Sequence, residues 1–319
     1  MKRDLIQTSD FDADTLVRMF NLAGEIKSLV KRRQFLSVLN GYTAALIFQK
    51  PSLRTRVTFD VGIKQLGGHS VYLGPSEISM GVRESVYDVA RNLERWVDLI
   101  VARVFSQAHI KELAQVAEPP VINALSDEEH PCQVFADFLT LKEKGLKWPE
   151  LKLAYVGDGN NVCTSLMITS AILGAEMRVG SPAQYAPPDH VIAEVNKLNA
   201  QSGGKFFLVN DPREAVRGAN AVYTDIWASM GWENEAAERA KVFRPYQLNE
   251  ALMKEAAPGA FVMHDLPAHR GEEITDGVMD CPTSIVFDQA ENRLHMQKVV
   301  ALECLGLFDE AKNEIQTKK

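Results

Sequence analysis

The chain has 319 residues, of which 46% are hydrophobic and 24% are charged, and this composition is typical of a globular protein with about two domains. The formal net charge of −7 and the absence of a long basic run argue against nucleic acid as a partner. The N-terminus lacks the apolar segment of a secretory signal, and no stretch approaches the ~20 apolar residues of a membrane span. We therefore expect a cytoplasmic protein without a membrane partner.

The elements predicted from hydrophobic periodicity alternate between strands and helices, which is typical of parallel βαβ units. In the first half we predict helices near residues 12–31, 54–66, 85–96, 107–117 and 130–143, and strands near 42–48, 70–73, 99–103 and 121–123. In the second half, helices separate strands that we predict near 152–156, 176–179, 205–209, 221–224 and 261–264. A terminal helical run extends from about 291 to 315.

A turn-like stretch at residues 144–149 separates the two halves. We therefore predict the α/β class, with two doubly wound parallel-sheet domains over residues 1–147 and 148–290. We expect the terminal helix, about 291–319, to pack back onto the first domain, and the active site to lie in the interdomain cleft.

One segment, Ser52-Leu53-Arg54-Thr55-Arg56, opens a predicted helix directly after an apolar strand. A hydroxyl, two guanidinium groups and the free amides of a helix N-terminus meet there, and this combination suits a phosphate. A serine before a helix is also commonly a plain N-cap, so the motif alone leaves both interpretations open.

Two further polar points favour the binding interpretation. The segment His130-Pro131-Cys132-Gln133 opens another predicted helix after a strand, and Arg103 ends a third strand. Open α/β sheets bind ligands at the carboxyl ends of their strands, where these three points are expected.

A glycine motif, Gly157-Asp158-Gly159, follows the first strand of the second half and raises the alternative of a dinucleotide-binding enzyme. The third glycine of that fingerprint would fall at Val162, and no acidic residue follows the next strand in the usual way. No Walker A sequence is present. Cys132, Cys163, Cys281 and Cys304 form no CxxC pair, so we predict no metal and no cofactor.

The order of the motifs resembles that of ornithine carbamoyltransferases over nearly the whole chain. These motifs are Ser-x-Arg-Thr-Arg, the strand-end Arg103, His-Pro-x-Gln, Gly157-Asp158-Gly159-Asn160-Asn161, Asp225-Ile226-Trp227-Ala228-Ser229-Met230-Gly231, His264-Asp265-Leu266-Pro267 and Glu291-Asn292-Arg293. The resemblance implies transfer of the carbamoyl group of carbamoyl phosphate to the δ-amine of L-ornithine, giving citrulline and phosphate. It implies a carbamoyl phosphate-binding first domain and an ornithine-binding second domain.

By this resemblance, the carbamoyl phosphate site comprises Ser52, Leu53, Arg54, Thr55, Ser76, Arg103, His130, Gln133, Leu266 and Arg293. The first helical amides, with Ser52, Arg54 and Thr55, would hold the phosphate, and Arg103 would bridge phosphate and carbonyl. The carbonyl oxygen would accept from His130. The carbamoyl amide would contact Gln133, Arg293 and the backbone near Leu266.

The ornithine site implied by the resemblance comprises Asn161, Asp225, Ser229, Met230 and Asp265. The catalytic residues would be Arg54, Arg103, His130 and Asp265. The family also implies a homotrimer in which each site borrows from the neighbouring subunit's loop around Ser76, although serine is shorter than the family's glutamine, so the contact with the phosphate could be lost or made through water. The direction of the reaction, anabolic or catabolic, is open.

Two positions depart from the family pattern. Asp265 stands where the family loop normally has a cysteine, and Ser76 stands where a glutamine is common. A carboxylate beside the incoming amine could act as a general base, or as an ion partner that stabilises the unreactive ammonium. Three alternatives therefore remain: ornithine transfer, transfer to another acceptor such as putrescine, an N-acylornithine or aspartate, and a non-catalytic paralogue.

Overall fold

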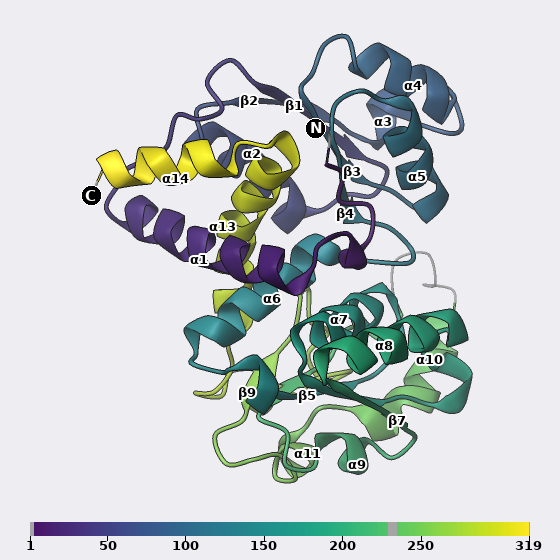
Figure 1. Cartoon of the computed structure of the whole chain (residues 1–319). Coiled ribbons are helices and arrows are strands. Elements are labelled where there is room, and N and C mark those ends of the chain that lie inside the picture. The colour runs from purple at the N-terminus through teal and green to yellow at the C-terminus, as the bar shows by residue number, and fades with distance from the viewer. Residues whose placement is uncertain (1–2, 229–234, 319) are drawn as a thin grey trace. The chain divides into compact units, whose positions relative to one another are not determined.

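The computed structural model describes residues 3–228 and 235–318 (Figure 1). The chain forms two compact units, one from Met1–Leu139 with Glu291–Lys319 and the other from Thr140–Ala290. The division between the units falls between Leu139 and Thr140, inside the helix α6 (Pro131–Glu143). The sequence predicts this boundary at the turn over residues 144–149, a few residues later. Within the described residues, we find no helix long and apolar enough to cross a membrane.

The first unit contains a parallel four-stranded sheet in the order β2-β1-β3-β4. Its strands are β1 (Thr43–Phe48), β2 (His69–Leu73), β3 (Leu99–Arg103) and β4 (Val121–Leu125). Its helices are α1 (Ala13–Lys31), α2 (Leu53–Gln65), α3 (Pro75–Ile78), α4 (Val86–Leu93), α5 (Gln107–Val116), α14 (Phe308–Thr317) and the larger parts of α6 (Pro131–Glu143) and α13 (Val286–Leu305). A 3-10 turn, η1 (Thr8–Asp10), precedes α1.

Both faces of the central strands of this sheet are buried. Ala45 and Ile47 of β1 pack with the apolar sides of α4 and α5, and the alternate residues Ala44 and Leu46 are equally buried. Since side chains alternate along a strand, both faces of β1 are covered. Near-continuous apolar strands of this kind are characteristic of parallel sheets, whose crossover helices cover them.

The second unit contains a parallel five-stranded sheet in the order β7-β6-β5-β8-β9. Its strands are β5 (Lys152–Val156), β6 (Glu176–Gly180), β7 (Lys205–Val209), β8 (Ala221–Tyr223) and β9 (Phe261–Met263). Its helices include α7 (Asn161–Leu173), α8 (Asp189–Ser202), α9 (Pro212–Val216), α10 (Ala236–Phe243), α11 (Glu250–Met253) and α12 (Asp276–Met279). Figure 1 shows α7 and α8 on one side of this sheet and α9 and α11 on the other.

Short 3-10 turns join these elements at η2 (Trp148–Glu150), η3 (Ala183–Tyr185) and η5 (Arg244–Tyr246). The core of this unit joins β5, β8 and β9 to α9, α10 and α12 through Val156, Val222, Phe243 and Val278. The predicted α/β class with two parallel sheets is confirmed.

Each sheet has a point at which the strand order reverses. It lies between β1 and β3 in the first unit and between β5 and β8 in the second. In open α/β sheets, the crevice outside the carboxyl ends of strands at such a point is where ligands bind. The loops after these four strands are therefore where a functional site is expected.

The prediction of a single terminal helix from about 291 to 315 is wrong. The helix α13 begins at Val286 and ends at Leu305, and α14 begins at Phe308. The chain turns at Gly306, whose φ of 71° lies in the left-handed region that glycine adopts without strain. The apolar spacing continues across this turn, so periodicity did not reveal it.

Candidate active site

The helix α2 begins immediately after β1, and Ser52 is its N-cap. The Ser52 hydroxyl accepts a hydrogen bond from the Thr55 amide at 3.3 Å. The cap and the phosphate interpretations are compatible, because the cap occupies only the Thr55 amide. The other amides of the first turn of α2 remain at the carboxyl end of β1, where they could donate to an anion. Leu53 is 74% exposed, so its backbone amide rather than its side chain is the group suited to an anion.

The two arginines in this motif have different surroundings. The charge of Arg54 acts on the imidazole of His130, as described below. The guanidinium carbon of Arg56 instead lies 3.7 Å from the centroid of the Tyr72 ring, a cation–π contact on the exposed side of α2. The expectation that two guanidinium groups converge at the helix N-terminus is therefore not met by Arg56.

Arg103 ends β3 directly beside the end of β1. Its register partner on β1 is Phe48, and the pairing of β3 with β4 shifts between Ala102 and Arg103. Such an irregularity re-aims the side chain at the end of a strand. Arg103 is buried, and it lies at the reversal point of the sheet.

His130 precedes α6 and is the centre of a group of positive charges. Burial is the largest cause that lowers the pKa of His130 well below its ordinary value, and the charges of three arginines lower it further: Arg293, Arg103 and Arg54. The imidazole is therefore neutral near pH 7, and it can donate one N–H to a neutral oxygen. The three guanidinium groups gather where a dianion would be stabilised.

Hydrogen bonds fix two of the predicted residues, Arg293 and Gln133. Arg293 donates from Nη2 to Thr55 Oγ1 at 2.6 Å, which connects α13 to α2. Gln133 donates from Nε2 to Asp137 Oδ1 at 2.8 Å, so its amide orientation is fixed. Among the described residues, no donor lies within hydrogen-bond distance of the buried Gln133 Oε1, and this oxygen can accept from a ligand amide.

In the second unit, the loop after β5 contacts the segment after β8. Asn160 caps α7 by accepting from the amides of Val162 and Cys163, and its Nδ2 donates to Asp225 Oδ2 at 2.7 Å. A side chain at Gly159 would meet the Pro187 nitrogen at 2.4 Å, so this close approach of the loop requires glycine. The predicted Asn161 is the first residue of α7, directly after Asn160.

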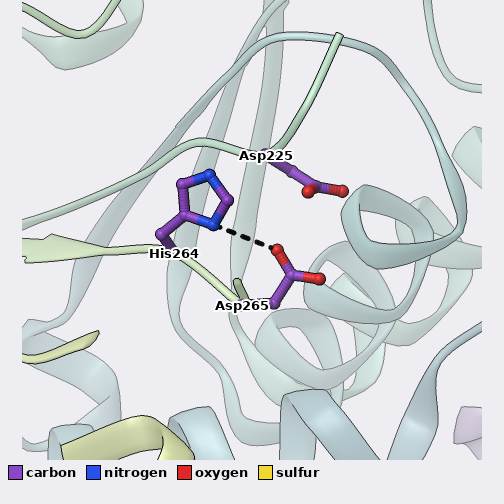
Figure 2. Close-up of side chains that lie close together, drawn as sticks. All are labelled: Asp225, His264 and Asp265. Carbon is purple, nitrogen blue, oxygen red and sulfur yellow. Dashed lines mark ion pairs between the residues drawn. The ribbon is translucent and has the colours of Figure 1, made fainter. Parts of the chain in front are cut away.

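Figure 2 shows Asp225, His264 and Asp265 close together, with His264 and Asp265 at the end of β9 and Asp225 after β8. The Nδ1 atom of His264 lies 3.4 Å from Asp265 Oδ1 and 2.9 Å from the Leu266 amide nitrogen. Leu266 itself has a φ of 61°, which is unfavourable for a bulky side chain. The hydrogen bond to His264 helps to hold this conformation.

The electrostatics of this cluster are unusual. Burial raises the pKa of Asp225 well above its ordinary value, and the negative charge of Asp265 raises it further. Burial alone would lower the pKa of His264, but the carboxylates of Asp265 and Glu273 together raise it to about 10. The cluster therefore combines a carboxyl group that resists ionisation with an imidazole that its carboxylate neighbours favour in the protonated form, although His264 Nδ1 accepts from the Leu266 amide only while Nδ1 is unprotonated.

Glu273 is a member of this cluster that sequence reasoning missed. It is fully buried, and it contacts His264 Nε2 at 3.0 Å and accepts from the His269 amide at 2.6 Å. Asn160 was missed as well, because it stands beside the predicted Asn161. The pair of asparagines in the glycine motif was a usable signal for Asn160, whereas Glu273 carries no local signal.

The ligand atoms of Asp225, His264 and Asp265 lie within 4.8 Å of one another and could hold a divalent cation. A metal requires deprotonated ligands, so the raised pKa of Asp225 opposes binding near neutral pH. Of the remaining predicted residues, Ser76 is exposed on α3. Ser229 and Met230 lie outside the described residues.

The fold and these two sites describe a two-unit α/β protein with cationic groups at the reversal point of one sheet and acidic groups at that of the other. Residues 3–143 match the family model "Aspartate/ornithine carbamoyltransferase, carbamoyl-P binding domain". Residues 149–304 match "Aspartate/ornithine carbamoyltransferase, Asp/Orn binding domain". The chain belongs to the aspartate/ornithine carbamoyltransferase family.

Individual relatives agree along almost the whole chain. The ornithine carbamoyltransferase of Thermococcus kodakarensis is 49% identical over 304 residues, which are 95% of this chain and 96% of that protein. A catabolic ornithine carbamoyltransferase of Thermoplasma acidophilum is 44% identical over 305 residues, covering 96% of this chain and 99% of that protein. The solved ornithine carbamoyltransferase of Pyrococcus furiosus has a TM-score of 0.93 at 48% identity and covers 96% of this chain and 97% of that one.

Proposed function

We propose that this protein is an ornithine carbamoyltransferase, which transfers the carbamoyl group of carbamoyl phosphate to the δ-amine of L-ornithine and releases citrulline and phosphate. The observation that carries the proposal is the near full-length identity of 49% to an enzyme of that name. The chemistry of the two described sites supports it independently.

The first unit provides the groups that carbamoyl phosphate needs. Its phosphate carries negative charge, which the guanidinium groups of Arg54 and Arg103 and the first amides of α2 are suited to hold. The neutral imidazole of His130 donates to the carbonyl oxygen, on which charge develops as the amine attacks. Gln133 Oε1 accepts from the carbamoyl amide.

The second unit provides acceptors for an amino acid. Asp225 and Asn160 lie at the reversal point of the sheet, where the α-amino and α-carboxyl groups of ornithine require partners of opposite character. In the transfer, the δ-nitrogen forms a bond to the carbonyl carbon and the bond from that carbon to the phosphate oxygen breaks. No covalent enzyme intermediate is needed, so positioning and electrostatics supply the acceleration.

Asp265 is the proposed acceptor of the amine proton. A lysine-like amine has a pKa near ~10.4, so presenting it unprotonated at pH 7.5 costs roughly 4 kcal/mol. A proton on His264, whose Nδ1 lies 3.4 Å from Asp265 Oδ1, would favour an ionised Asp265, and a negative charge on the neighbouring Asp225 would oppose its ionisation. With one neighbour that favours its ionised form and one that opposes it, the Asp265 carboxylate can take up the amine proton as the C–N bond forms.

The test is an acceptor panel in which carbamoyl phosphate is supplied with ornithine, putrescine, acetylornithine, succinylornithine, lysine or aspartate. We expect citrulline and phosphate with ornithine at a rate far above that of every other acceptor. Cyanate, which forms when carbamoyl phosphate decomposes, must be supplied alone as a control because it carbamoylates amines without an enzyme. Turnover of another acceptor with no turnover of ornithine would contradict the proposed substrate. It would then indicate that the loop at Asp265 selects that other acceptor.

We also propose a homotrimer, in which the exposed Ser76 on α3 faces the carbamoyl phosphate site of a neighbouring subunit. Light scattering then gives a mass three times the 35.5 kDa of one chain. A monomer that is fully active would contradict this assignment of Ser76.

A further inference from the structure

One buried arginine in the second unit is not accounted for by the proposed chemistry. Arg239 lies on α10 and is 6% exposed. Its Nη1 donates to Asp158 Oδ2 at 2.7 Å and to the Trp227 carbonyl oxygen at 3.0 Å, and its Nε donates to Glu235 at 3.2 Å. The guanidinium carbon lies 4.6 Å from the centroid of the Tyr185 ring.

The pair formed by Arg239 and Asp158 is poorly suited to a purely stabilising role. Desolvation raises the pKa of Asp158 even though the charge of Arg239 lowers it, so burial is expensive for this carboxylate. A buried ion pair often contributes no more to stability than well-packed apolar side chains of similar volume. We therefore ask which parts of the chain the ion pair holds in place.

The two acceptors of Arg239 Nη1 belong to the two loops that flank the reversal point of the sheet. Asp158 is in the loop after β5, two residues before Asn160, and Trp227 is two residues after Asp225 on the segment that follows β8. Asn160 donates to Asp225 across the same two segments. Arg239 and Asn160 therefore make two successive connections between one pair of loops.

We propose that Arg239 is a positioning residue for the amino-acid acceptor, because it holds the loop after β5 against the segment after β8 and so keeps Asn160 and Asp225 in binding geometry. This inference rests on the proposed function of the second unit as the acceptor site. Arg239 acts through Asp158 and the Trp227 carbonyl, and it leaves the carbamoyl phosphate groups of the first unit untouched.

The role requires the shape of arginine as well as its charge. The planar guanidinium reaches Asp158, Trp227 and Glu235 while its face stacks over Tyr185. A lysine ammonium is a single point and cannot reproduce this arrangement of donors. Arg239→Lys therefore keeps the positive charge near Asp158 but loosens the connection to Trp227.

The test compares steady-state kinetics of Arg239→Lys and Asp158→Asn with the parent, using Arg244→Gln as the matched control. Arg244 lies five residues further along the same unit, is exposed, and donates to the Gly271 carbonyl at 3.2 Å. We expect the KM for the acceptor to rise tenfold or more in both loop variants, and the KM for carbamoyl phosphate to change less than twofold. The control should match the parent in both constants.

Two results would overturn the inference. One is an unchanged acceptor KM in Arg239→Lys. The other is a parallel loss in Tm, kcat and both KM values, which indicates a merely structural role. The double variant provides a further check, because two residues that act through one contact give a combined effect well below the product of the single effects.

The outcome is separable from that of the proposed function. If the parent is inactive with ornithine but uses another acceptor of the panel, the ornithine assignment fails. The KM of each variant relative to that of the parent is then measured with that other acceptor. If the parent uses no acceptor, the proposed function fails. The crystal structure of Arg239→Lys then decides the positioning role, which requires the hydrogen bond between Asn160 and Asp225 to be lost.

Discussion

Asp265 is the residue to which we assign the base of the proposed reaction, and its surroundings bear on that role. The carboxylate lies beside the imidazole of His264 and the carboxyl group of Asp225, and its side chain is 13% exposed. A carboxylate at this position is a candidate base for the attacking amine.

Replacement of Asp265 by asparagine should lower kcat at neutral pH by a factor of at least ten, because proton removal by a positioned base contributes roughly 10²–10⁴-fold. The loss should persist as pH rises toward the pKa of the free δ-amine, since the attacking amine must still lose a proton as the C–N bond forms. The measurement is kcat with saturating ornithine between pH 7 and 10. An Asp265→Asn variant as fast as the parent at pH 7 contradicts the role of base.

Arg54 and Arg56 form a matched pair on one helix. We expect Arg54→Ala to lower kcat/KM for carbamoyl phosphate by roughly 10²–10³-fold, because it removes the charge that we propose to hold the phosphate and the developing oxyanion. Arg56→Ala should change it less than threefold, since this side chain stacks on Tyr72. Equal losses in the two variants would show that the helix N-terminus, not the Arg54 charge, determines the effect.

His264 should make folding stability depend on pH. Its pKa rises to about 10 in the folded protein, from an ordinary value of 6.5. The stabilisation is therefore complete below about pH 6.5 and is lost as pH rises through about 10, with a slope of at most about 1.4 kcal/mol per pH unit between them. Urea unfolding of the parent and of His264→Gln at pH 7 to 9.5 measures this slope, which should be shallower in the variant.

At the scale of elements, α7 and α11 begin in the same way, yet only one borders the candidate site. Asn160 and Asn249 each accept from two amides of the first turn. Asn160→Ala and Asn249→Ala should each cost about 0.5–2 kcal/mol of stability by loss of the cap. Of these two variants, only Asn160→Ala should also raise the KM for ornithine, because Asn160 contacts Asp225 and Asn249 does not. An unchanged KM for ornithine in Asn160→Ala would show that Asn160 does not contribute to the ornithine site.

The elements that the sequence predicted well are those with a strong apolar period. The strand predicted at 99–103 matches β3, and the helix predicted at 12–31 differs from α1 by one residue. The short helix α3 was not predicted, since four residues carry too little periodicity. The turn at Gly306 was not predicted either, because a single glycine did not interrupt the apolar spacing.

The sequence predicted the site residues that stand in local motifs. It did not predict those that only the fold brings together. Ser52, Arg54 and His130 stand at helix starts and strand ends, so the pattern of elements alone brings them to one edge of a sheet. The carbamoyl and ornithine roles came from resemblance, not from that pattern. Glu273 and Asn160 became visible only through their contacts with His264 and Asp225, which join residues 9 and 65 positions apart.

At the scale of the whole molecule, two similar sheets carry opposite chemistry at equivalent points. The reversal between β1 and β3 gathers guanidinium groups and a neutral imidazole, and the reversal between β5 and β8 gathers carboxyl groups and an amide. A phosphorylated donor and an amine acceptor need these opposite environments. The architecture thus assigns one substrate to each unit, which is the central claim of the proposed function.

The most direct test of this claim follows the carbon that is transferred. The protein is mixed with carbamoyl phosphate labelled with ¹³C at the carbonyl and with unlabelled ornithine, and the products are followed by NMR beside an enzyme-free sample. We predict that the label appears in the ureido carbon of citrulline with one phosphate released for each citrulline. Label that appears as bicarbonate or cyanate at the enzyme-free rate, with ornithine unchanged, would contradict the account.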